Sequence, residues 1–355
     1  MPELNPQLVE DAIQLLIRLI RTPSFSREEG PTAELIAGFL TAHGAAPQRA
    51  GHNVWATSRH FDAAKPTVLL NSHHDTVKPG ASWTYDPFGA VLEGDKLTGL
   101  GSNDAGASAV SLLATFLHFY EQELPYNLIC AITAEEEISG TDGVSSILPL
   151  LGKIDLGIVG EPTQMDLAVA EKGLVVLDCV AHGKTGHAAR NEGENALYKA
   201  VADIEWIRQY QFPEASPLLG PVKMTVTQVQ AGSQHNVVPD RCTFVVDVRT
   251  NEFYSNEDVV RTVQAHVQSE VTPRSLRLNS SRISPEHPLV QRGVALGRKT
   301  FGSVTLSDQA LMSFDTVKIG PGDSARSHTP DEYILLSEIR GGIREYVELL
   351  DGLVL

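Results

Sequence analysis

Two residues able to bind a metal ion or to carry a proton follow an apolar, strand-like run early in the chain. His73 and Asp75 come directly after Val68-Leu69-Leu70-Asn71, and a spacing of two in an extended segment places both side chains on one face. Taken alone, such a pair is more typical of a structural role. Ligands of open α/β sheets, however, bind beyond the carboxyl ends of the strands, so the position of the pair makes it a candidate site.

Further candidates lie in comparable places. Glu135-Glu136-Glu137 and Glu161 follow predicted strands, Asp104 precedes a predicted helix, and His328 lies in a late loop. Each has a simpler interpretation when taken alone. Asp104 can be a helix N-cap, the three glutamates a surface acidic cluster, and His328 a solvated histidine in a Gly/Pro/Ser-rich loop. Their common placement favours one joint site over several independent structural roles.

The residue types in this set indicate a metal site. They supply imidazole and carboxylate donors and no thiolate, which suits zinc or a similar divalent ion in an open catalytic site. Three adjacent carboxylates at the end of a buried strand also repel one another, so we expect a positive charge to hold them.

The first half of the chain alternates strands and helices. Its predicted elements are a helix from Asn5-Pro6, a helix from Gly30 to Gly44, the strands Asn53–Ser58 and Thr67–Ser72, the helix Ala105–Phe119, the strand Asn127–Thr133, a short helix near Gly143–Leu150 and the strand Asp155–Val159. This alternation predicts an α/β fold with a mostly parallel sheet and helices on both faces.

A different pattern begins near Glu171. The predicted elements are the strand Gly173–Ala181, the helix Glu194–Tyr210, the strands Lys223–Val229 and Arg241–Val248, the helix Asn256–Glu270 and the extended segment Ser275–Asn279. The order β-α-β-β-α-β is that of a ferredoxin-like domain. The first pattern returns with the helix Pro288–Thr300, a strand at Asp315–Ile319 and the helix Ser337–Leu350. We therefore expect a catalytic domain formed by residues 1–172 and 283–355, with residues 173–282 inserted as an α+β domain.

Composition excludes several classes of protein. The 355 residues carry a formal net charge of −16, which argues against a nucleic-acid partner bound through its phosphates. Apolar residues make up 42% and charged residues 20%, as in a globular protein with a sizeable core. We expect a cytoplasmic protein, because neither a targeting segment nor a membrane span is recognisable. The three cysteines lie in apolar runs and are expected to be buried thiols.

Five segments together resemble the co-catalytic dinuclear zinc amidohydrolases and peptidases, in particular the branch of acetylornithine deacetylase and succinyl-diaminopimelate desuccinylase. The segments are Ser72-His73-x-Asp75-x-Val77, Gly99-x-Gly101-x-x-Asp104, Glu135-Glu136-Glu137, Gly160-Glu161-Pro162-Thr163 and Ser327-His328-x-x-Asp331-Glu332. None is specific alone, but all five occur in the family's order across nearly the whole chain.

The resemblance implies a role for each candidate. Asp104 would bridge two metal ions, with His73 and Glu161 at one ion and Glu137 and His328 at the other, while Asp75 holds His73 from behind. Glu136 would remain unligated and act as the general base that takes a proton from water and passes it to the leaving nitrogen. Charge balance favours two divalent ions, most simply zinc, with cobalt as an alternative, since three ligating carboxylates and a hydroxide carry about four negative charges.

The inserted domain contributes further expected residues. By the same resemblance, it forms a lid and homodimer interface, and His187 reaches the site of a partner subunit and stabilises the oxyanion. Asn236 and Arg249 would bind substrate, Arg249 as a fork for the α-carboxylate. Many relatives carry a lysine two positions after the bridging aspartate, whereas this chain has Gly106 there, so no role of that lysine carries over.

The expected activity is the metal-dependent removal of an acyl group from the α-nitrogen of an amino acid. The resemblance favours N-acetylornithine or N-acetylcitrulline as the substrate, in arginine biosynthesis. A succinyl-diaminopimelate desuccinylase and a dipeptidase-like carboxypeptidase are the alternatives within the class. A non-catalytic metal- or ligand-binding protein is the alternative outside it, and an uncoordinated Glu136 beside the water site argues against that reading.

Overall fold

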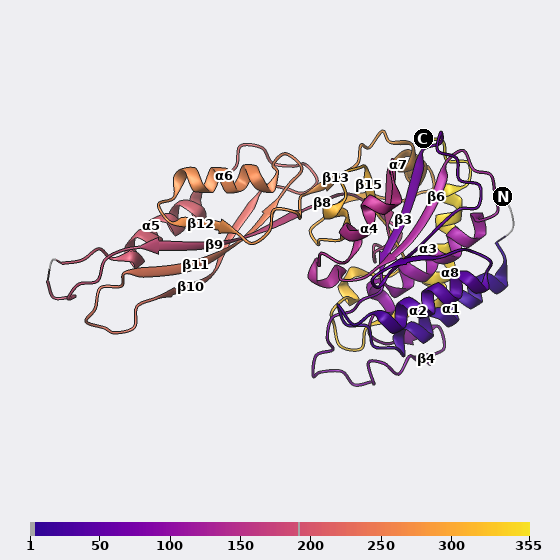
Figure 1. Ribbon diagram of the computed structural model, residues 1–355, viewed down its shortest axis with the longest axis horizontal. Coiled ribbons are helices and arrows are strands. Elements are labelled where there is room, and N and C mark those ends of the chain that lie inside the picture. The colour runs from indigo at the N-terminus through magenta and orange to yellow at the C-terminus, as the bar shows by residue number, and fades with distance from the viewer. Residues whose placement is uncertain (1–3, 191) are drawn as a thin grey trace. The chain divides into compact units, whose positions relative to one another are not determined.

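The computed structural model describes residues 4–190 and 192–355, and the chain divides into two compact units (Figure 1). Unit 1 comprises the chain up to Val169 together with Ile283–Phe301 and Ser307–Leu355, and unit 2 comprises Ala170–Arg282 and Gly302–Leu306. The short segment Gly302–Leu306 was not expected in unit 2. It belongs there because Gly302 lies close against the backbone of Leu218, and Ser303 accepts a hydrogen bond from the backbone of Lys172 (3.1 Å).

Unit 1 is built on a sheet with the strand order β1-β2-β6-β3-β7-β15-β8. The bounds are β1 Gln48–Ala50, β2 Asn53–Thr57, β3 Thr67–His73, β6 Asn127–Thr133, β7 Leu156–Val159, β8 Leu167–Glu171 and β15 Thr316–Lys318. The pairs β6·β3, β3·β7 and β7·β15 are parallel, whereas the outer pairs β1·β2, β2·β6 and β15·β8 are antiparallel. The sheet is thus mixed, with a parallel centre of four strands.

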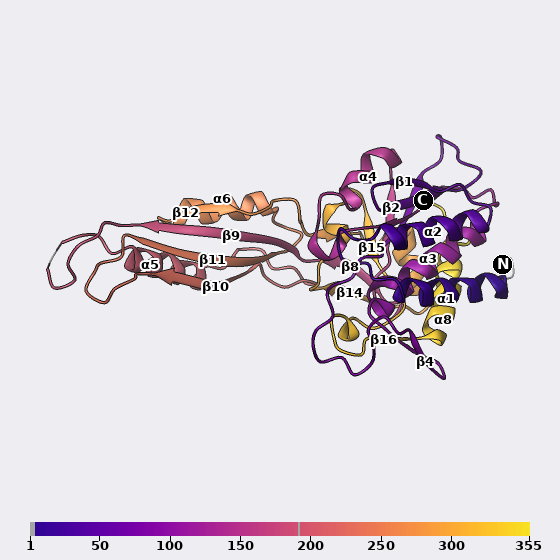
Figure 2. The ribbon, with the colours of Figure 1, turned by 60° about the horizontal axis from the view of Figure 1, so that its bottom comes forward.

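Helices cover both faces of this sheet. Their bounds are α1 Pro6–Ile20, α2 Gly30–Ala42, α3 Ala107–Phe119, α4 Val144–Leu151, α7 Pro288–Ala295 and α8 Leu336–Leu350. Alternate residues of β3 enter different cores: Val68 and Leu70 pack with α1, α3 and α8, whereas Leu69 packs with α4. Figure 2 shows α4 and α8 on opposite sides of unit 1. This arrangement confirms the α/β fold with helices on both faces.

A small antiparallel sheet completes unit 1. It has the order β16-β5-β4, with β4 at Val91–Glu93, β5 at Lys96–Thr98 and β16 at Tyr333–Leu335. Tyr333 pairs with Thr98. The sheet therefore brings the segment that follows β5 beside the segment that precedes β16, although more than two hundred residues separate them in sequence.

Unit 2 is the expected ferredoxin-like domain. Its elements are β9 Gly173–His182, α5 Ala196–Gln209, β10 Lys223–Ala231, β11 Arg241–Thr250, α6 Asn256–His266 and β12 Glu270–Pro273. The strand order is β10-β11-β9-β12, with all neighbours antiparallel. Both helices pack on one face of the sheet, in a core that includes Leu177, Ile207 and Val263.

Two element boundaries differ from those expected. Helix α6 ends at His266, because the buried carboxylate of Asp203 accepts the backbone N–H groups of Gln268 and Ser269 (3.0 and 2.8 Å) and turns the chain away. The fourth strand is consequently β12, not Ser275–Asn279. Helix α7 ends at Ala295, just before Gly297 adopts a positive φ of 86°, a conformation that glycine tolerates.

The three cysteines have the burial that their apolar sequence surroundings predict. Cys130, Cys179 and Cys242 are buried free thiols. Within the described part of the chain, no helix is long and apolar enough to cross a membrane.

Candidate functional site

Seven of the expected residues meet at the carboxyl edge of the parallel centre in unit 1. They are His73 and Asp75 after β3, Glu136 and Glu137 after β6, Glu161 after β7, His328 in the loop that follows β15, and Asp104 in the turn Ser102–Gly106. Four adjacent parallel strands therefore each deliver side chains to one edge, which is where open α/β sheets form their sites.

His73 is oriented from both sides of its ring. Its side chain is 1% exposed, and Nδ1 lies 3.0 Å from the backbone oxygen of Asp75 and 3.4 Å from the carboxylate of the same residue. These acceptors favour a proton on Nδ1. The other nitrogen, Nε2, then faces the carboxylates of the cluster and is the ring atom available to a metal ion.

The two oxygens of Asp104 face two different histidines. Oδ1 lies 3.3 Å from Nε2 of His73, and Oδ2 lies 3.5 Å from Nε2 of His328. Asp104 does not cap helix α3, because that helix begins at Ala107 with Gly106 as its N-cap residue and has no side-chain cap hydrogen bond. The simpler N-cap interpretation therefore fails, and the carboxylate is directed into the cluster.

Each histidine has a second carboxylate partner. Oε1 of Glu161 lies 3.6 Å from Nε2 of His73, and Oε2 of Glu137 lies 3.0 Å from Nε2 of His328. Oε2 of Glu136 is farther, 3.9 Å from Nε2 of His73. The donors thus divide into a His73 group and a His328 group that share Asp104, with Glu136 beside the first.

These spacings fit a metal centre. Two ligands of one tetrahedral zinc ion, each bound at about 2.0–2.1 Å, lie about 3.3 Å apart. The separations of His73 and of His328 from their carboxylate partners range from 3.0 to 3.6 Å. Donor atoms of His73, Glu136 and Glu161 lie within 4.8 Å of one another, as do those of His73, Asp104 and Glu137. The residues present can therefore hold divalent cations.

The electrostatics of the cluster also favour a bound cation. Burial raises the pKa of Glu161 to about 8. Burial likewise raises the pKa of Glu136 well above its ordinary value, with nearby carboxylates adding to the effect. The hydrogen bond to Glu137 raises the pKa of His328 to about 9. Buried carboxylates outnumber the two histidines, and a divalent ion is the charge that relieves such crowding.

The three consecutive glutamates have different surroundings. Glu135 adopts a left-handed backbone conformation (φ 56°), and its buried side chain lies 3.7 Å from the guanidinium of Arg27. Glu136 and Glu137 instead reach the cluster from a single helical turn, Glu136–Ile138. Among the described residues, Arg27 is thus the positive charge beside Glu135, and His328 is the one beside Glu137.

Buried carboxylates hold the backbone of this triplet. Asp75 accepts the N–H groups of Glu136 (3.0 Å) and Glu137 (3.2 Å) and the hydroxyl of Ser26 (2.7 Å). Glu29, which is fully buried, accepts the N–H of Glu135 (3.2 Å). Asp75 thus positions two acidic residues in addition to His73. These contacts to Glu136 and Glu137 were not expected from the sequence.

Sequence reasoning missed three buried carboxylates around the site. Glu29 and Asp308 lie outside the recognised segments, and Glu332 was quoted only as part of one. Asp308 accepts a hydrogen bond from Thr133 (2.9 Å), and Glu332 accepts backbone N–H groups around Asp104. The one available signal for Glu332 was an acidic residue four positions after His328. Nothing local in the sequence marks Glu29 or Asp308.

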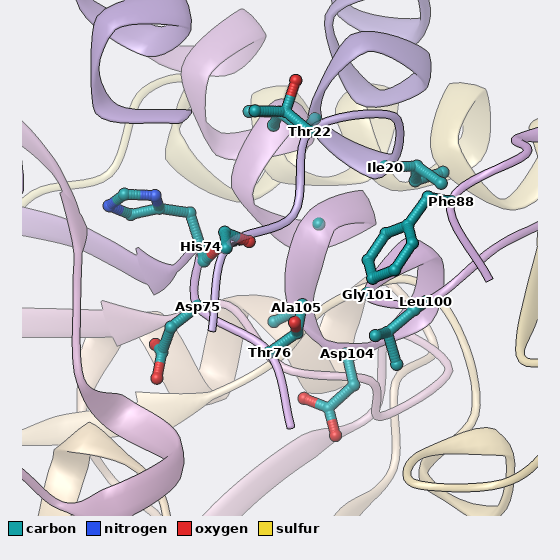
Figure 3. Close-up of a pocket in the computed structure, with 13 residues that line it drawn as sticks. Ile20, Thr22, His74, Asp75, Thr76, Phe88, Leu100, Gly101, Asp104 and Ala105 are labelled. Atoms are coloured by element: carbon teal, nitrogen blue, oxygen red, sulfur yellow. Dashed lines mark hydrogen bonds between the residues drawn. The ribbon is translucent and has the colours of Figure 1, made fainter. Parts of the chain in front are cut away.

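A pocket lies behind the aspartates and includes the apolar side chains of Ile20, Phe88 and Leu100. Figure 3 shows the carboxylates of Asp75 and Asp104 pointing away from Ile20 and Phe88. It also shows the ring of His74 pointing away from both aspartates. His74 is buried between Thr32 and the backbone oxygen of His52 (2.9 and 3.1 Å), and burial lowers its pKa to about 4. It is a neutral core histidine.

The other expected residues lie in unit 2. The exposed loops of His187 and Asn236 run side by side: His187 bridges to Val237, and Ala188 donates to the backbone oxygen of Asn236 (3.0 Å). Arg249 on β11 donates two hydrogen bonds to Asp247 (2.9 and 3.1 Å). Its guanidinium fork is therefore already occupied, which the sequence pattern Asp-Val-Arg did not reveal.

Comparison with known proteins agrees with this geometry. Residues 169–274 match the peptidase dimerisation domain of the M20 family. Over 276 residues the chain is 29% identical to the succinyl-diaminopimelate desuccinylase of Paracoccus denitrificans, covering 72% of each chain. An M20 family metallo-carboxypeptidase from Sulfolobus solfataricus superposes with a TM-score of 0.73 at 19% identity, covering 96% of this chain and 98% of that one.

A further solved structure of similar fold is that of a dinuclear metal-binding peptidase. The Bacillus subtilis YXEP protein, described as a dinuclear metal-binding peptidase of the M20 family, superposes with a TM-score of 0.73 at 16% identity and covers 98% of both chains. The chain is an amidohydrolase with the M20 fold. The resemblance inferred from the five segments is thereby confirmed. The expected link to arginine biosynthesis finds no support, because the curated relatives are named for succinyl-diaminopimelate.

The positioning of Glu136 and Glu137 by Asp75 can be tested by substitution. We expect Asp75→Asn to speed amide hydrogen exchange at Glu136 or Glu137, because an amide nitrogen cannot accept the N–H group that one carboxylate oxygen accepts now. A buried donor left unpaired costs about 1–3 kcal/mol. Ser26→Ala is the matched control, since it removes the hydroxyl partner of Asp75 and leaves both amide contacts. Equal exchange in the two variants would contradict this positioning role.

Proposed function

We propose that the protein is a dinuclear-metal hydrolase that removes an N-acyl group, most favourably succinyl, from the nitrogen of an amino acid. The observation that carries the proposal is the division of the donors into two groups around the two oxygens of Asp104. A site for a single ion would not need both oxygens to face different histidines.

In this proposal His73 and Glu161 hold one ion, Glu137 and His328 hold the other, and Asp104 bridges them. Zinc suits the donor set best and cobalt is the alternative. When bound, the two ions polarise the amide carbonyl and make water more acidic. The side chain of His328 is 54% exposed, whereas that of His73 is 1% exposed, so the His328 group is the one open to solvent.

Glu136 acts as the general base. Its nearest approach to Nε2 of His73, 3.9 Å, is longer than the other donor contacts, which suits a carboxylate that stands beside the ion of the His73 group. It takes a proton from water and later delivers that proton to the leaving nitrogen. A protein that only bound metal or ligand would have no use for such a carboxylate, so the site supports an enzyme over a binding protein.

The succinyl preference rests on the curated relatives and on a group of cations in unit 2. Lys223 and Arg249 are direct cross-strand neighbours on β10 and β11. Burial lowers the pKa of Lys172, and both neighbouring cations lower it further. Asp247 balances one of the three charges. The remaining positive charge can attract the terminal carboxylate that a succinyl group carries and an acetyl group lacks.

A homodimer is also part of the proposal, supported by the match of residues 169–274 to a dimerisation domain. Strand β10 is an exposed edge of the unit 2 sheet, and such an edge can pair with another chain. His187 would stabilise the oxyanion from the partner subunit, with Asn236 beside it. Arg249 would act as one of the cations around Lys223. It would not bind a substrate carboxylate by itself.

The bridging role of Asp104 is tested by metal content. We expect Asp104→Ala to reduce bound zinc at both sites, because its two oxygens serve both groups, whereas Glu137→Ala should reduce it at one site only. Atomic absorption after dialysis against a defined zinc buffer gives the stoichiometry. Chelation should also abolish turnover, and zinc or cobalt should restore it. Equal metal loss in the two variants, or a fully active metal-free protein, would refute the dinuclear site.

The assignment of the base is tested within the triplet. We expect Glu136→Gln to lower kcat by roughly 10²–10⁴-fold while zinc content is retained, since only the proton carrier is lost. Glu135→Gln is the matched control, because its side chain lies against Arg27 and away from the cluster. Substantial activity in the Glu136 variant, or an equal loss in both, would rule out the assignment.

The substrate is tested with a panel of N-succinyl-diaminopimelate, N-acetylornithine, N-acetylcitrulline and a dipeptide, with amine release as the readout. We expect the succinyl compound to have the highest kcat/KM. A dipeptide as the best substrate would instead favour the carboxypeptidase alternative, which the structural likeness to the Sulfolobus enzyme keeps open.

The same panel tests the cations of unit 2. Lys223→Met should lower kcat/KM for the succinyl compound about 2- to 5-fold relative to the acetyl compounds, the range for one exposed ion pair. Lys153→Met, which removes an exposed lysine of unit 1 paired with Asp155, is the control. An equal loss of kcat/KM on all substrates would show that Lys223 does not recognise the carboxylate of the succinyl group.

A further inference from the structure

Glu332 is a buried carboxylate that holds the turn carrying Asp104. It is 2% exposed. One of its oxygens accepts the backbone N–H groups of Asn103 (2.8 Å) and Asp104 (2.9 Å), and the other accepts that of Gly101 (3.2 Å). A single side chain thus pairs three N–H groups of the turn Ser102–Gly106 and of the residue before it. No helix or strand pairs these groups instead.

The small sheet of unit 1 places Glu332 there. Tyr333 on β16 pairs with Thr98 on β5, and the backbone oxygen of Glu332 accepts the N–H of Gly99 (2.9 Å). The register therefore fixes Glu332 directly beside the residues that lead to Asp104. Because Glu332 follows His328 by four positions, the same pairing anchors the loop that carries His328.

Asn103, in the turn that carries Asp104, binds in return to the loop that carries His328. Its side-chain nitrogen donates to the backbone oxygen of Asp323 (3.1 Å) and to the hydroxyl of Ser327 (3.3 Å), and its side-chain oxygen accepts the N–H of Asp323 (3.0 Å). Glu332 and Asn103 form a reciprocal clamp, in which each loop contributes one buried polar side chain to the backbone of the other. Both residues are almost fully buried.

We infer that Glu332 is a positioning residue that fixes Asp104 relative to His328 before any metal binds. One carboxylate oxygen of Asp104 lies 3.3 Å from Nε2 of His73, and the other lies 3.5 Å from Nε2 of His328. His73 belongs to the end of a buried strand, but His328 lies on a long loop, with a left-handed backbone (φ 57°). The clamp ties the turn that carries Asp104 directly to the loop that carries His328.

The inference rests on the proposed function in one respect, namely that the second oxygen of Asp104 serves the His328 ion. Glu332 touches neither metal nor substrate and acts only through Asp104 and its turn. Its loss is therefore expected to weaken the binding of the second ion more than that of the first, and to lower kcat more than it raises KM.

The experiment compares Glu332→Gln and Glu332→Ala in the full chain. Hydrogen exchange in the metal-free protein should be at least about fivefold faster at the amides of Gly101, Asn103 and Asp104 in the alanine variant, because three buried donors lose their acceptor. The glutamine variant keeps one acceptor oxygen and should be intermediate. Cobalt titration, followed by visible absorption, should show the second binding step weakened about 10- to 100-fold, as for other supporting residues of metal sites.

Asp155→Asn is the matched control. Asp155 accepts the backbone N–H of Thr67 (2.9 Å) at the start of β3, at the opposite end of that strand from His73. This variant should leave the cobalt titration unchanged even if it lowers the stability of unit 1.

Glu332 would lose its assigned role if exchange at Asp104 and the second cobalt step were both unchanged in the glutamine and alanine variants. An equal weakening of both cobalt steps would also contradict it, since that pattern indicates general destabilisation. If the parent chain bound cobalt at one site only, the dinuclear function would fail, while the exchange measurement would still decide whether Glu332 holds the turn.

Discussion

The site depends on keeping several negative charges together in a buried place. Asp75, Asp104, Glu136, Glu137 and Glu161 all lie at one edge of the sheet, with side chains no more than 13% exposed. Carboxylates so close repel one another, and burial removes the water that would otherwise screen them. The fold must therefore hold these groups against a force that favours their separation.

Backbone N–H groups provide much of that restraint. Asp75 takes those of Glu136 and Glu137, Glu29 takes that of Glu135, and Glu332 takes three around Asp104. Asp104, Glu136 and Glu137 are thus carried on turns whose own donors are bound by other buried carboxylates. Hydrogen bonds of N–H groups to ionised acceptors are stronger than neutral ones. They offset part of the cost of burying the supporting residues and immobilise the turns in the same contact.

The sequence could predict the site because its parts occur at strand ends. The parallel centre β6-β3-β7-β15 brings the residues after each strand to a common edge, and alternation of strands and helices is visible without a structure. The resemblance of five segments then indicated seven converging residues. The ferredoxin-like order of unit 2 was equally visible, although the end of helix α6, the fourth strand and the short segment Gly302–Leu306 were misplaced.

The supporting residues could not be found in this way, because each acts on a partner far away in sequence. Glu29 lies 106 positions from the backbone it holds, and Glu332 lies 228 positions from Asp104. A carboxylate that accepts a backbone N–H leaves no periodicity or motif of its own. For Arg249 the sequence pattern misled in another way. It suggested a guanidinium available to a substrate, but that group is hydrogen-bonded to Asp247, two residues earlier on the same strand.

The Glu135-Glu136-Glu137 run shows how one backbone conformation separates identical side chains. The left-handed conformation at Glu135 reverses the chain directly after β6, and the next residues form a single helical turn. Glu135 consequently lies beside Arg27, while the following two side chains reach His73 and His328. The backbone N–H groups of Glu136 and Glu137 bind Asp75, and that of Glu135 binds Glu29. Three equal residues in a row thereby come to lie beside an arginine and two different histidines, and the difference lies in the turn and in the buried acceptors that hold it.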